Sequence, residues 1–199
     1  MELYEALGMS EISTYISSSP SVPTKPGSPG KPQLGRSVCI LPVSGGEEPL
    51  EAGETGLIAV HRSDPGMMLG YWNRPADDEA VLRGDWFIGG DLGHFDDEGY
   101  VWFKGRNDDV MTSFGYRISP LEVELAIMRH PAVQQAGVTE VELNPGMKLV
   151  SAFVVMREHE TLTASEVISF ASNSLARYKV PKQVFFVEAL PQSGNGKII

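Results

Sequence analysis

Residues 84–110 read GDWFIGGDLGHFDDEGYVWFKGRNDDV, and this stretch decides the fold of the first half of the chain. Two short apolar runs, Trp86–Gly89 and Gly99–Phe103, flank a turn made of Asp96, Asp97, Glu98 and Gly99. Apolar runs bounded by Gly and Asp clusters are typical of β-strands joined by tight turns. The acidic turn lacks the alternating ligands of an EF-hand loop. We therefore predict two strands here rather than a calcium site.

Upstream of this stretch the pattern of short strands continues. Strands are predicted at Glu2–Leu7, Ser37–Pro42 and Gly56–His61, and a short acidic helix is predicted at Pro75–Leu82. In the segment Ser17–Pro32, 12 of 16 residues are Ser, Pro or Gly, which excludes a helix. Two interpretations of this segment stay open, a flexible linker and an ordered loop that wraps a neighbour. The regular short strands indicate a small barrel or a distorted sheet.

Downstream of residue 107 the pattern becomes a mixture of helices and strands. Ser119 and Pro120 supply an N-cap followed by proline at the first helical position, and Glu122 completes a capping-box start. The charge changes at the same point, because residues 1–107 hold 8 Lys/Arg against 16 Asp/Glu, whereas residues 108–199 hold 8 against 10. Strands are predicted at Val110, Tyr116–Ile118, Val133–Val138, Leu149–Met156 and Gln183–Val187, and helices at Pro120–Met128 and Ala164–Ala176. We predict an α+β fold with a domain boundary near residue 107.

Composition excludes several classes of protein. The net charge of −10 repels nucleic-acid backbones and anionic membrane surfaces. The single cysteine, Cys39, permits neither an internal disulfide nor a thiolate metal cluster. The first residues lack the basic and apolar regions of a signal peptide, and Leu149–Met156 is far shorter than the roughly 20 residues of a membrane helix. We expect a cytoplasmic protein with no nucleic-acid partner and no membrane span.

Two clusters in the first half carry side chains suited to binding a nucleotide. In the Leu7–Glu11 turn, Ser10 suits a phosphate and Glu11 a hard cation, although a plain strand exit explains the turn as well. Asp91 follows a glycine pair, where a carboxylate is able to accept from two vicinal ribose hydroxyls, although a hairpin turn also explains it.

Three further clusters have equally open interpretations. Arg106 either donates a fork of hydrogen bonds to hydroxyl or phosphate oxygens or pairs with Asp108 or Asp109. Residues 114–117, Phe-Gly-Tyr-Arg, combine close backbone approach, an aromatic ring and a cation. Residues 191–197 end in Lys197 but lack the spacing of a P-loop, which leaves a flexible arm with one positive charge or a fraying terminus.

Six phrases of the sequence together resemble the C-terminal part of the adenylate-forming superfamily. This superfamily comprises AMP-forming acyl-CoA synthetases, adenylation domains of peptide synthetases, and luciferases. The phrases cover nearly the whole chain in the order of the family: LGMSE (7–11), GYWNRP (70–75), the stretch 84–110, GYRISPLEVE (115–124), YKVPKQV (178–184) and LPQSGNGKI (190–198).

The resemblance implies an architecture for each part of the chain. Residues 1–107 are expected to be the tail of the N-terminal AMP-binding domain, including a small distorted β-barrel subdomain. Residues 108–199 are expected to be the compact α+β lid domain, with Asp108 as the hinge. The large N-terminal domain with its Ser/Thr/Gly-rich phosphate loop has no counterpart here, so the chain is expected to be a fragment with little activity alone, and the missing domain is a candidate partner as a separate chain.

The resemblance also implies roles for the nucleotide-side residues. Ser10 would contact the nucleotide phosphate, Glu11 would hold Mg²⁺, and Asp91 and Arg106 would contact the ribose. Two positions depart from the family, which commonly has an adenine-stacking aromatic residue where Leu7 stands, and Thr or Ser where Gly90 stands.

The remaining roles concern catalysis and the second substrate. Gly115 and Tyr116 would line the pantetheine channel, Arg117 would serve phosphate groups, and Lys197 would be the lysine of the adenylation step.

The resemblance implies acid–CoA ligation with ATP/AMP, Mg²⁺ and coenzyme A. A carboxylic acid, such as a fatty or aromatic acid, would attack the ATP α-phosphate to form an acyl-adenylate, and the CoA thiol would then displace AMP. Positioning and positive charge at the developing negative charge are what such phosphoryl chemistry needs. Two alternatives stay open: an adenylation domain that loads a carrier protein, and a non-catalytic module that binds CoA or AMP or mediates an interaction.

Overall fold

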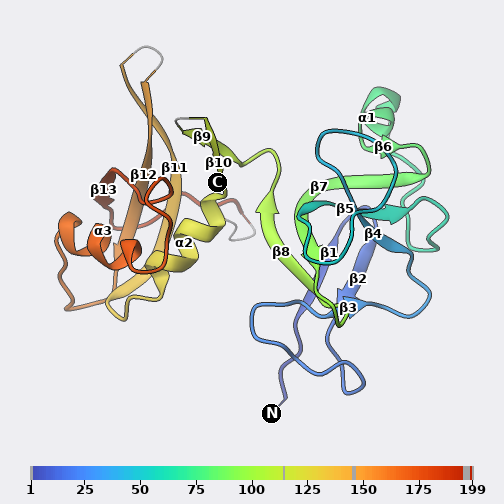
Figure 1. Ribbon diagram of the computed structural model, residues 1–199, viewed down its shortest axis with the longest axis horizontal. Coiled ribbons are helices and arrows are strands. Elements are labelled where there is room, and N and C mark those ends of the chain that lie inside the picture. Colours follow the sequence, from blue (N-terminus) through green and yellow to red (C-terminus); the bar gives the residue numbers. More distant parts are fainter. Residues whose placement is uncertain (1, 114, 145–146, 195–197, 199) are drawn as a thin grey trace. The chain divides into compact units, whose positions relative to one another are not determined.

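The stretch 84–110 forms the predicted pair of strands, and both strands extend beyond the predicted ends. The computed structural model describes residues 2–113, 115–144, 147–194 and 198. In it, β7 (Trp86–Phe95) and β8 (Val101–Arg106) are antiparallel neighbours (Figure 1). The prediction ended the first strand at Gly89, but β7 continues through the glycine pair, where its register with β5 shifts: Ile88 lies opposite Ala59, and Leu92 lies opposite Leu57.

The chain divides into two compact units, Met1–Asp108 and Asp109–Ile199. The described part of the first unit, residues 2–108, contains two antiparallel sheets and one short helix, α1 (Pro75–Ala80). One sheet has the order β1-β2-β3, and the other has the order β4-β5-β7-β6 with β8 also paired to β7. The remaining strands of this unit are β1 (Ala6–Met9), β2 (Ser13–Ser17), β3 (Lys31–Pro32), β4 (Val38–Leu41), β5 (Gly56–His61) and β6 (Leu82–Arg83).

The first unit is therefore built from open, distorted sheets, and the distorted sheet is one of the two forms that the sequence indicates. Among the described residues, the strand pairings do not close into a barrel. The core includes fully buried side chains from both sheets: Ile12, Tyr15 and Ile16 around the β1–β2 hairpin, and Ile40, Val60, Phe87 and Val101 of the larger sheet. The first strand lies at Ala6–Met9 rather than at the predicted Glu2–Leu7.

The Ser/Pro/Gly-rich segment is an ordered loop that packs against β8. Ser28 is fully buried, and its Oγ donates to the Val101 carbonyl at 2.6 Å. The Val101 N–H donates to the Gly30 carbonyl at 2.9 Å. Lys25 pairs with Asp96 in the turn between β7 and β8 at 2.8 Å. These contacts select the ordered loop over the flexible linker.

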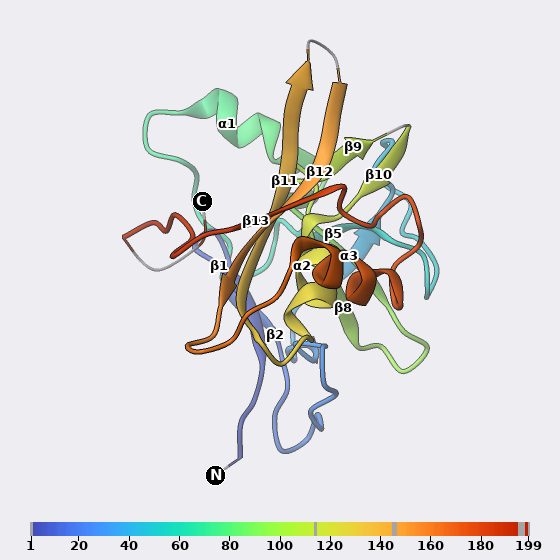
Figure 2. The same cartoon turned by 90° about the vertical axis from the view of Figure 1, so that its left-hand side faces the viewer.

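The described residues of the second unit form a three-stranded sheet with two helices on one face, beside a small two-stranded sheet (Figure 2). The long strands β11 and β12 are antiparallel, whereas β13 runs parallel to β12. The elements are β9 (Met111–Ser113), β10 (Tyr116–Ile118), α2 (Pro120–Met128), β11 (Val133–Asn144), β12 (Met147–Met156), α3 (Ala164–Ser172) and β13 (Gln183–Phe186).

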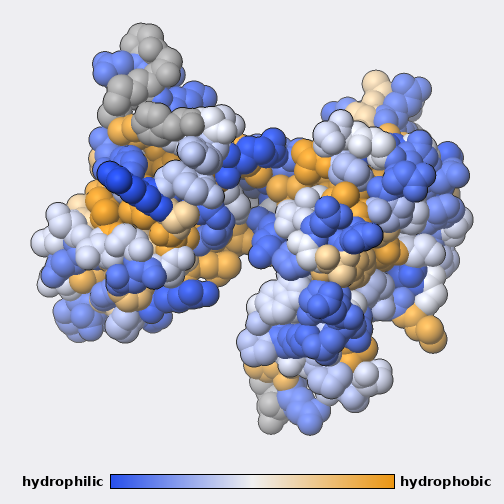
Figure 3. Space-filling view, in the orientation of Figure 1, coloured by the Kyte–Doolittle hydropathy of each residue, from blue (hydrophilic) through white to orange (hydrophobic). Residues whose placement is uncertain are grey.

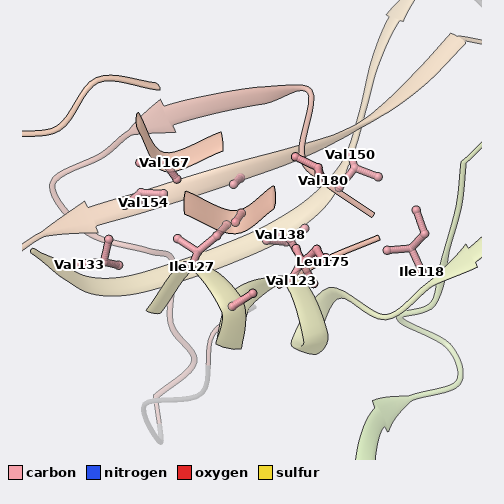
Figure 4. Close-up of a cluster of buried hydrophobic side chains, with 14 of the residues drawn as sticks. Ile118, Val123, Ile127, Val133, Val138, Val150, Val154, Val167, Leu175 and Val180 are labelled. Carbon is pink, nitrogen blue, oxygen red and sulfur yellow. The ribbon is translucent and has the colours of Figure 1, made fainter. Parts of the chain in front are cut away.

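Buried aliphatic side chains join the helices to this sheet (Figure 4). Val123 and Ile127 of α2 and Val167 of α3 pack against Val150 and Val154 of β12. Val150 and Val154 lie on one face of the sheet because side chains alternate along a strand. The structure confirms the predicted α+β class. The β11 and β12 strands are both longer than predicted, because β11 continues to Asn144 and β12 begins at Met147.

Both predicted helix starts are capped. The Ser119 hydroxyl accepts from the Glu122 N–H at 3.4 Å, but the Glu122 carboxylate accepts from Lys179 instead of completing a capping box. Thr163 and Glu166 form the full reciprocal box at α3.

The surface mixes polar and apolar residues (Figure 3). None of the helices in the described part of the chain combines the length and the apolar character that a bilayer span requires.

Candidate functional site

Asp91 and Arg106 lie directly opposite each other on β7 and β8. Directly opposed residues of an antiparallel ladder present their side chains to the same face of the sheet. Arg106 Nη1 lies 3.3 Å from Asp91 Oδ1. The Asp91 residue is only 7% exposed, whereas 43% of the Arg106 side chain is exposed. One face of the sheet therefore carries a sheltered carboxylate beside an accessible guanidinium.

The Arg106 guanidinium has two further sets of contacts. Its Nε and Nη2 donate to the two carboxylate oxygens of Asp108, each at 3.0 Å, and its Nη1 donates to the Gly89 carbonyl at 2.6 Å. The hydrogen bonds to Asp108, followed by the charges of Asp108 and Asp91, raise the pKa of Arg106. Of the two pairing partners open from the sequence, the structure selects Asp108.

The glycine pair lets the protein's own side chains approach β7. Gly90 has φ of +88°, and a Cβ there would lie 3.0 Å from Arg106 Nη2. A Cβ at Gly89 would lie 2.6 Å from the Met9 sulfur. The pair lies within β7 rather than in a hairpin turn, so this alternative for Asp91 is wrong. The glycine pair predicted from the sequence that some group lies close to the backbone here, but not that this group is the side chain of Arg106 or Met9.

Tyr15 is a residue of this region that sequence reasoning missed. It is fully buried, and its hydroxyl has no hydrogen-bond partner among the described residues. Burial, and secondarily the negative charge of Asp91, raise the pKa of the Tyr15 phenol. An aromatic residue in a strand is ordinary core material, so the sequence carried no signal for this position.

Ser10 and Glu11 lie in the turn between β1 and β2. Ser10 is exposed, whereas Glu11 is half-buried. Glu11 Oε1 accepts a hydrogen bond from the Tyr71 hydroxyl at 2.8 Å. Burial and then this hydrogen bond raise the pKa of Tyr71 to about 12. Tyr71 belongs to the phrase GYWNRP, but nothing in the phrase predicted its contact with a residue 60 positions away.

The donor set at Glu11 suits magnesium only together with another source of oxygen. Across the part of the chain that the structure describes, no three His, Cys, Asp or Glu side chains gather into a metal site. Mg²⁺ commonly binds one or two protein carboxylates and completes its shell with substrate phosphates and water. A single carboxylate at Glu11 fits this mode of binding.

In the second unit, Tyr116 stacks on Tyr178 with ring centroids 4.3 Å apart. Tyr116 is 53% exposed, so the open face of its ring is accessible to a ligand. Gly115 has φ of +82° and open space where a Cβ would stand, and Arg117 is exposed. The structure thus brings together two of the quoted phrases, GYRISPLEVE and YKVPKQV, through one aromatic pair.

Asp108 and Lys197 are the two remaining predicted site residues. Asp108 is the last residue of the first unit and is held by Arg106. Lys197, together with Phe114, lies outside the described residues.

Comparison with known proteins identifies relatives for the whole chain. Residues 122–197 match the family of AMP-binding enzyme C-terminal domains. The chain is 37% identical over 202 residues to the uncharacterized acyl–CoA ligase YtcI of Bacillus subtilis, covering 100% of this chain and 38% of that protein. It is 35% identical to the 2-succinylbenzoate–CoA ligase of Geobacillus kaustophilus, covering 99% of this chain and 40% of that protein.

Solved structures give the same result. O-succinylbenzoate coenzyme A synthetase (MenE) from Bacillus subtilis, in complex with ATP and magnesium ion, superimposes with a TM-score of 0.85 at 33% identity. That match covers 98% of this chain and 40% of the MenE chain. The chain thus spans about two fifths of the length of these relatives. Residues 122–197 therefore match the family of AMP-binding enzyme C-terminal domains, within a chain that is similar over nearly its whole length to part of several acyl–CoA ligases.

Proposed function

We propose that this chain takes part in the AMP-forming ligation of a carboxylic acid to CoA. In the first step a carboxylate oxygen bonds to the α-phosphorus of ATP, and the bond to pyrophosphate breaks. In the second step the CoA thiol, losing its proton, bonds to the acyl carbon, and the bond to AMP breaks. The observation that carries this proposal is the Asp91–Arg106 pair on one face of the β7–β8 ladder, in a chain related to acyl–CoA ligases.

Asp91 and Arg106 would bind the ribose of the nucleotide. A carboxylate accepts hydrogen bonds from two vicinal hydroxyls, and an arginine donates to the same oxygens. The low exposure of Asp91 strengthens such bonds because water competes less for a sheltered carboxylate. Ser10, exposed at the β1–β2 turn, would donate to a phosphate oxygen.

Glu11 would supply one oxygen ligand to a Mg²⁺ ion shared with the phosphates. The ion would neutralise phosphate charge when bound. Glu11 would orient the nucleotide through this ion, and Lys197 would place a positive charge at the α-phosphate during adenylation.

The acceptor side would be formed by the second unit. Tyr116, stiffened by its stack on Tyr178, offers a flat wall for the pantetheine arm, with Gly115 leaving space beside it. Arg117 adds a positive charge for the phosphates of CoA.

Residues 1–107 and 108–199 would then act as the tail of the nucleotide-binding domain and as a mobile lid. Asp108 would be the hinge between them. The Arg106–Asp108 pair is 43% and 65% exposed at its two side chains, and exposed ion pairs contribute only about 0–1 kcal/mol. A rotation at Asp108 would therefore lose little energy by breaking this pair.

Binding of AMP analogues to the 199-residue chain tests the ribose assignment. We expect calorimetry to rank AMP above 2′-deoxy-AMP and 2′,3′-dideoxy-AMP, and we expect Asp91→Asn to abolish the ranking. Equal affinity for AMP and the dideoxy analogue, or no binding at millimolar AMP, contradicts the proposal.

The acceptor and the activity need a separate assay. Pyrophosphate release from ATP and Mg²⁺ with a panel of carboxylic acids, followed by thioester analysis with CoA and with a phosphopantetheinyl carrier protein, distinguishes the two thiols. Because the 199 residues contain no Ser/Thr/Gly-rich phosphate loop, we expect the chain alone to turn over more slowly than about 1 s⁻¹.

A further inference from the structure

We propose that Tyr71 is a positioning residue for the Glu11 carboxylate, holding one of its oxygens so that the other is oriented toward a magnesium–nucleotide complex. The inference rests on the proposed function, because it takes Glu11 as the metal ligand. It assigns a role to Tyr71 of the GYWNRP phrase, for which the family resemblance implied none.

The central contact is a hydrogen bond between a neutral phenol and a carboxylate. The Tyr71 hydroxyl donates to Glu11 Oε1 at 2.8 Å, and both residues are half-buried. Hydrogen bonds to an ionised acceptor are shorter and about twice as strong as neutral ones. Within the described residues, the other oxygen, Oε2, accepts no hydrogen bond. One oxygen is thus engaged, and the second is available to a cation.

Tyr71 is itself held in place by the helix that follows it. The Tyr71 N–H donates to Asp78 Oδ1 of α1 at 2.8 Å. The Met68 N–H, three residues earlier, donates to the Glu11 carbonyl at 2.7 Å. The loop of residues 68–71 therefore donates hydrogen bonds to both the main chain and the side chain of Glu11.

The residues just before this loop are anchored to the β1–β2 hairpin through Arg36. Arg36 forms an ion pair with the buried side chain of Asp64, and its Nη2 donates to the Thr14 carbonyl of β2 at 3.1 Å. Asp64 Oδ1 also accepts from the Gly66 N–H at 2.8 Å. Because both ends of the segment 64–71 are anchored on the β1–β2 hairpin, the position of the Tyr71 hydroxyl relative to Glu11 is determined by the fold.

Magnesium is the cation for which this restraint matters. Mg²⁺ requires nearly ideal octahedral geometry at short distances, whereas Ca²⁺ accepts longer and more variable ones. Residues that orient a ligand typically contribute 10- to 100-fold to metal affinity. Removal of the Tyr71 hydroxyl should therefore weaken Mg²⁺ more than Ca²⁺, an effect that a merely structural role for Tyr71 does not produce.

The test is metal–nucleotide binding by the 199-residue chain, read by the enhancement of water-proton relaxation with Mn²⁺·ATP. Mg²⁺·ATP and Ca²⁺·ATP are then measured as competitors. We expect Tyr71→Phe to weaken Mn²⁺·ATP and Mg²⁺·ATP about tenfold and to lower the Mg²⁺-to-Ca²⁺ affinity ratio. Asp78→Ala, which removes the restraint on the Tyr71 main chain but keeps its ring, should give a smaller change in the same direction. Circular dichroism and the thermal midpoint check that each variant is folded.

Two controls separate the possible results. Tyr100→Phe also removes a tyrosine hydroxyl bond, to the Pro23 carbonyl at 2.9 Å, and should leave binding and the affinity ratio unchanged. Glu11→Gln should abolish the relaxation enhancement. If Glu11→Gln abolishes it while Tyr71→Phe behaves like the wild type, the inference about Tyr71 is wrong and the metal role of Glu11 stands. If Glu11→Gln has no effect, or the wild type gives no enhancement, both are wrong.

Discussion

Arg106 lies between two aspartates and contacts them unequally. Its Nη1 is 3.3 Å from Asp91 Oδ1, whereas its Nε and Nη2 each lie 3.0 Å from an oxygen of Asp108. A donor–acceptor distance of 3.3 Å is slightly longer than the usual range for an N–H···O bond. Asp108 and the Gly89 carbonyl, which lies 2.6 Å from Nη1, therefore orient the guanidinium. A ribose hydroxyl could replace Arg106 as the partner of Asp91 Oδ1 without loss of the Asp108 contacts.

Replacement of Arg106 by lysine should weaken AMP binding and leave the free energy of unfolding nearly unchanged. Lysine lacks the planar fork that reaches Asp91, Asp108 and the Gly89 carbonyl together. We expect AMP affinity to fall at least about tenfold, because a hydrogen bond to a charged group contributes roughly 1.5–3 kcal/mol. The free energy of unfolding should change by less than about 1 kcal/mol, because the closer ion pair of Arg106, with Asp108, is exposed and a lysine keeps the positive charge beside Asp91. Calorimetry and urea denaturation measure the two effects. Arg62→Lys, at another exposed position of the same unit, is the control, and an equal loss of affinity in both variants would contradict the assignment.

Gly90→Ala should disturb the Arg106 side chain as well as the backbone. A left-handed backbone at a non-glycine residue costs about 1–2 kcal/mol, and a Cβ at Gly90 would lie 3.0 Å from Arg106 Nη2. Gly99→Ala is the matched control, because Gly99 has φ of +81° with open space around it. Both variants should lose similar stability, but only Gly90→Ala should weaken AMP binding. Unchanged AMP affinity in Gly90→Ala would show that Arg106 does not contact the nucleotide.

A side chain at Gly30 should disrupt the packing of the loop of residues 17–32. A Cβ there would lie 2.1 Å from the main-chain carbon of Ser17, which side-chain rotation does not relieve. We expect Gly30→Ala to lower the free energy of unfolding by at least about 3 kcal/mol, measured by urea denaturation. Gly27→Ala also has a positive φ, but its Cβ would meet only the Trp102 ring at 3.5 Å. Similar losses in the two variants would argue against tight packing of the loop.

Acid should weaken the turn between β7 and β8 through Asp96. This carboxylate accepts hydrogen bonds from Lys25 at 2.8 Å and from the Tyr100 N–H at 2.9 Å. The bond from Lys25 is the main cause that lowers the pKa of Asp96 below its ordinary value of 3.8. A lowered pKa in the folded state means that the stabilisation is present above the unfolded-state pKa and is lost as the pH falls further.

The free energy of unfolding should therefore decrease as the pH is lowered below about 4, and Asp96→Asn should flatten this dependence. Urea denaturation at a series of pH values provides the measurement. Asp97→Asn, at the exposed neighbouring position, should keep the wild-type slope. A slope in Asp96→Asn equal to that of the wild type would be inconsistent with this account.

The Tyr116–Tyr178 stack should contribute to CoA binding. Aromatic pairs are worth roughly 0.5–1.5 kcal/mol beyond the area that they bury. We expect Tyr116→Ala to weaken CoA by roughly 2- to 10-fold, and Tyr116→Phe to retain affinity because the ring stays stacked. Phe185→Ala, which removes an exposed ring stacked on Phe153, is the control in the same unit. Calorimetry with CoA reports the effect, and loss of affinity in the Phe185 variant alone would exclude the proposed wall.

The sequence predicted well those features that local chemistry controls. The Ser119 cap and the acidic turn at Asp96 were found because short polar side chains reach only nearby backbone groups. The family relationship, read from six phrases, was confirmed by the comparisons. The end of β7 was misplaced because a glycine pair usually marks a turn, whereas here it lies inside a strand, at a register shift against β5.

By itself, therefore, the sequence determined the class of the fold, its family and the residue types available for chemistry, since each depends on spacing along the chain. Only the tertiary structure decided which of these residues meet. Asp91 and Arg106 face each other because of one ladder register, and Tyr71 reaches Glu11 across 60 positions because a loop is anchored at both ends. No periodicity encodes such contacts, because they arise from the packing of distant segments.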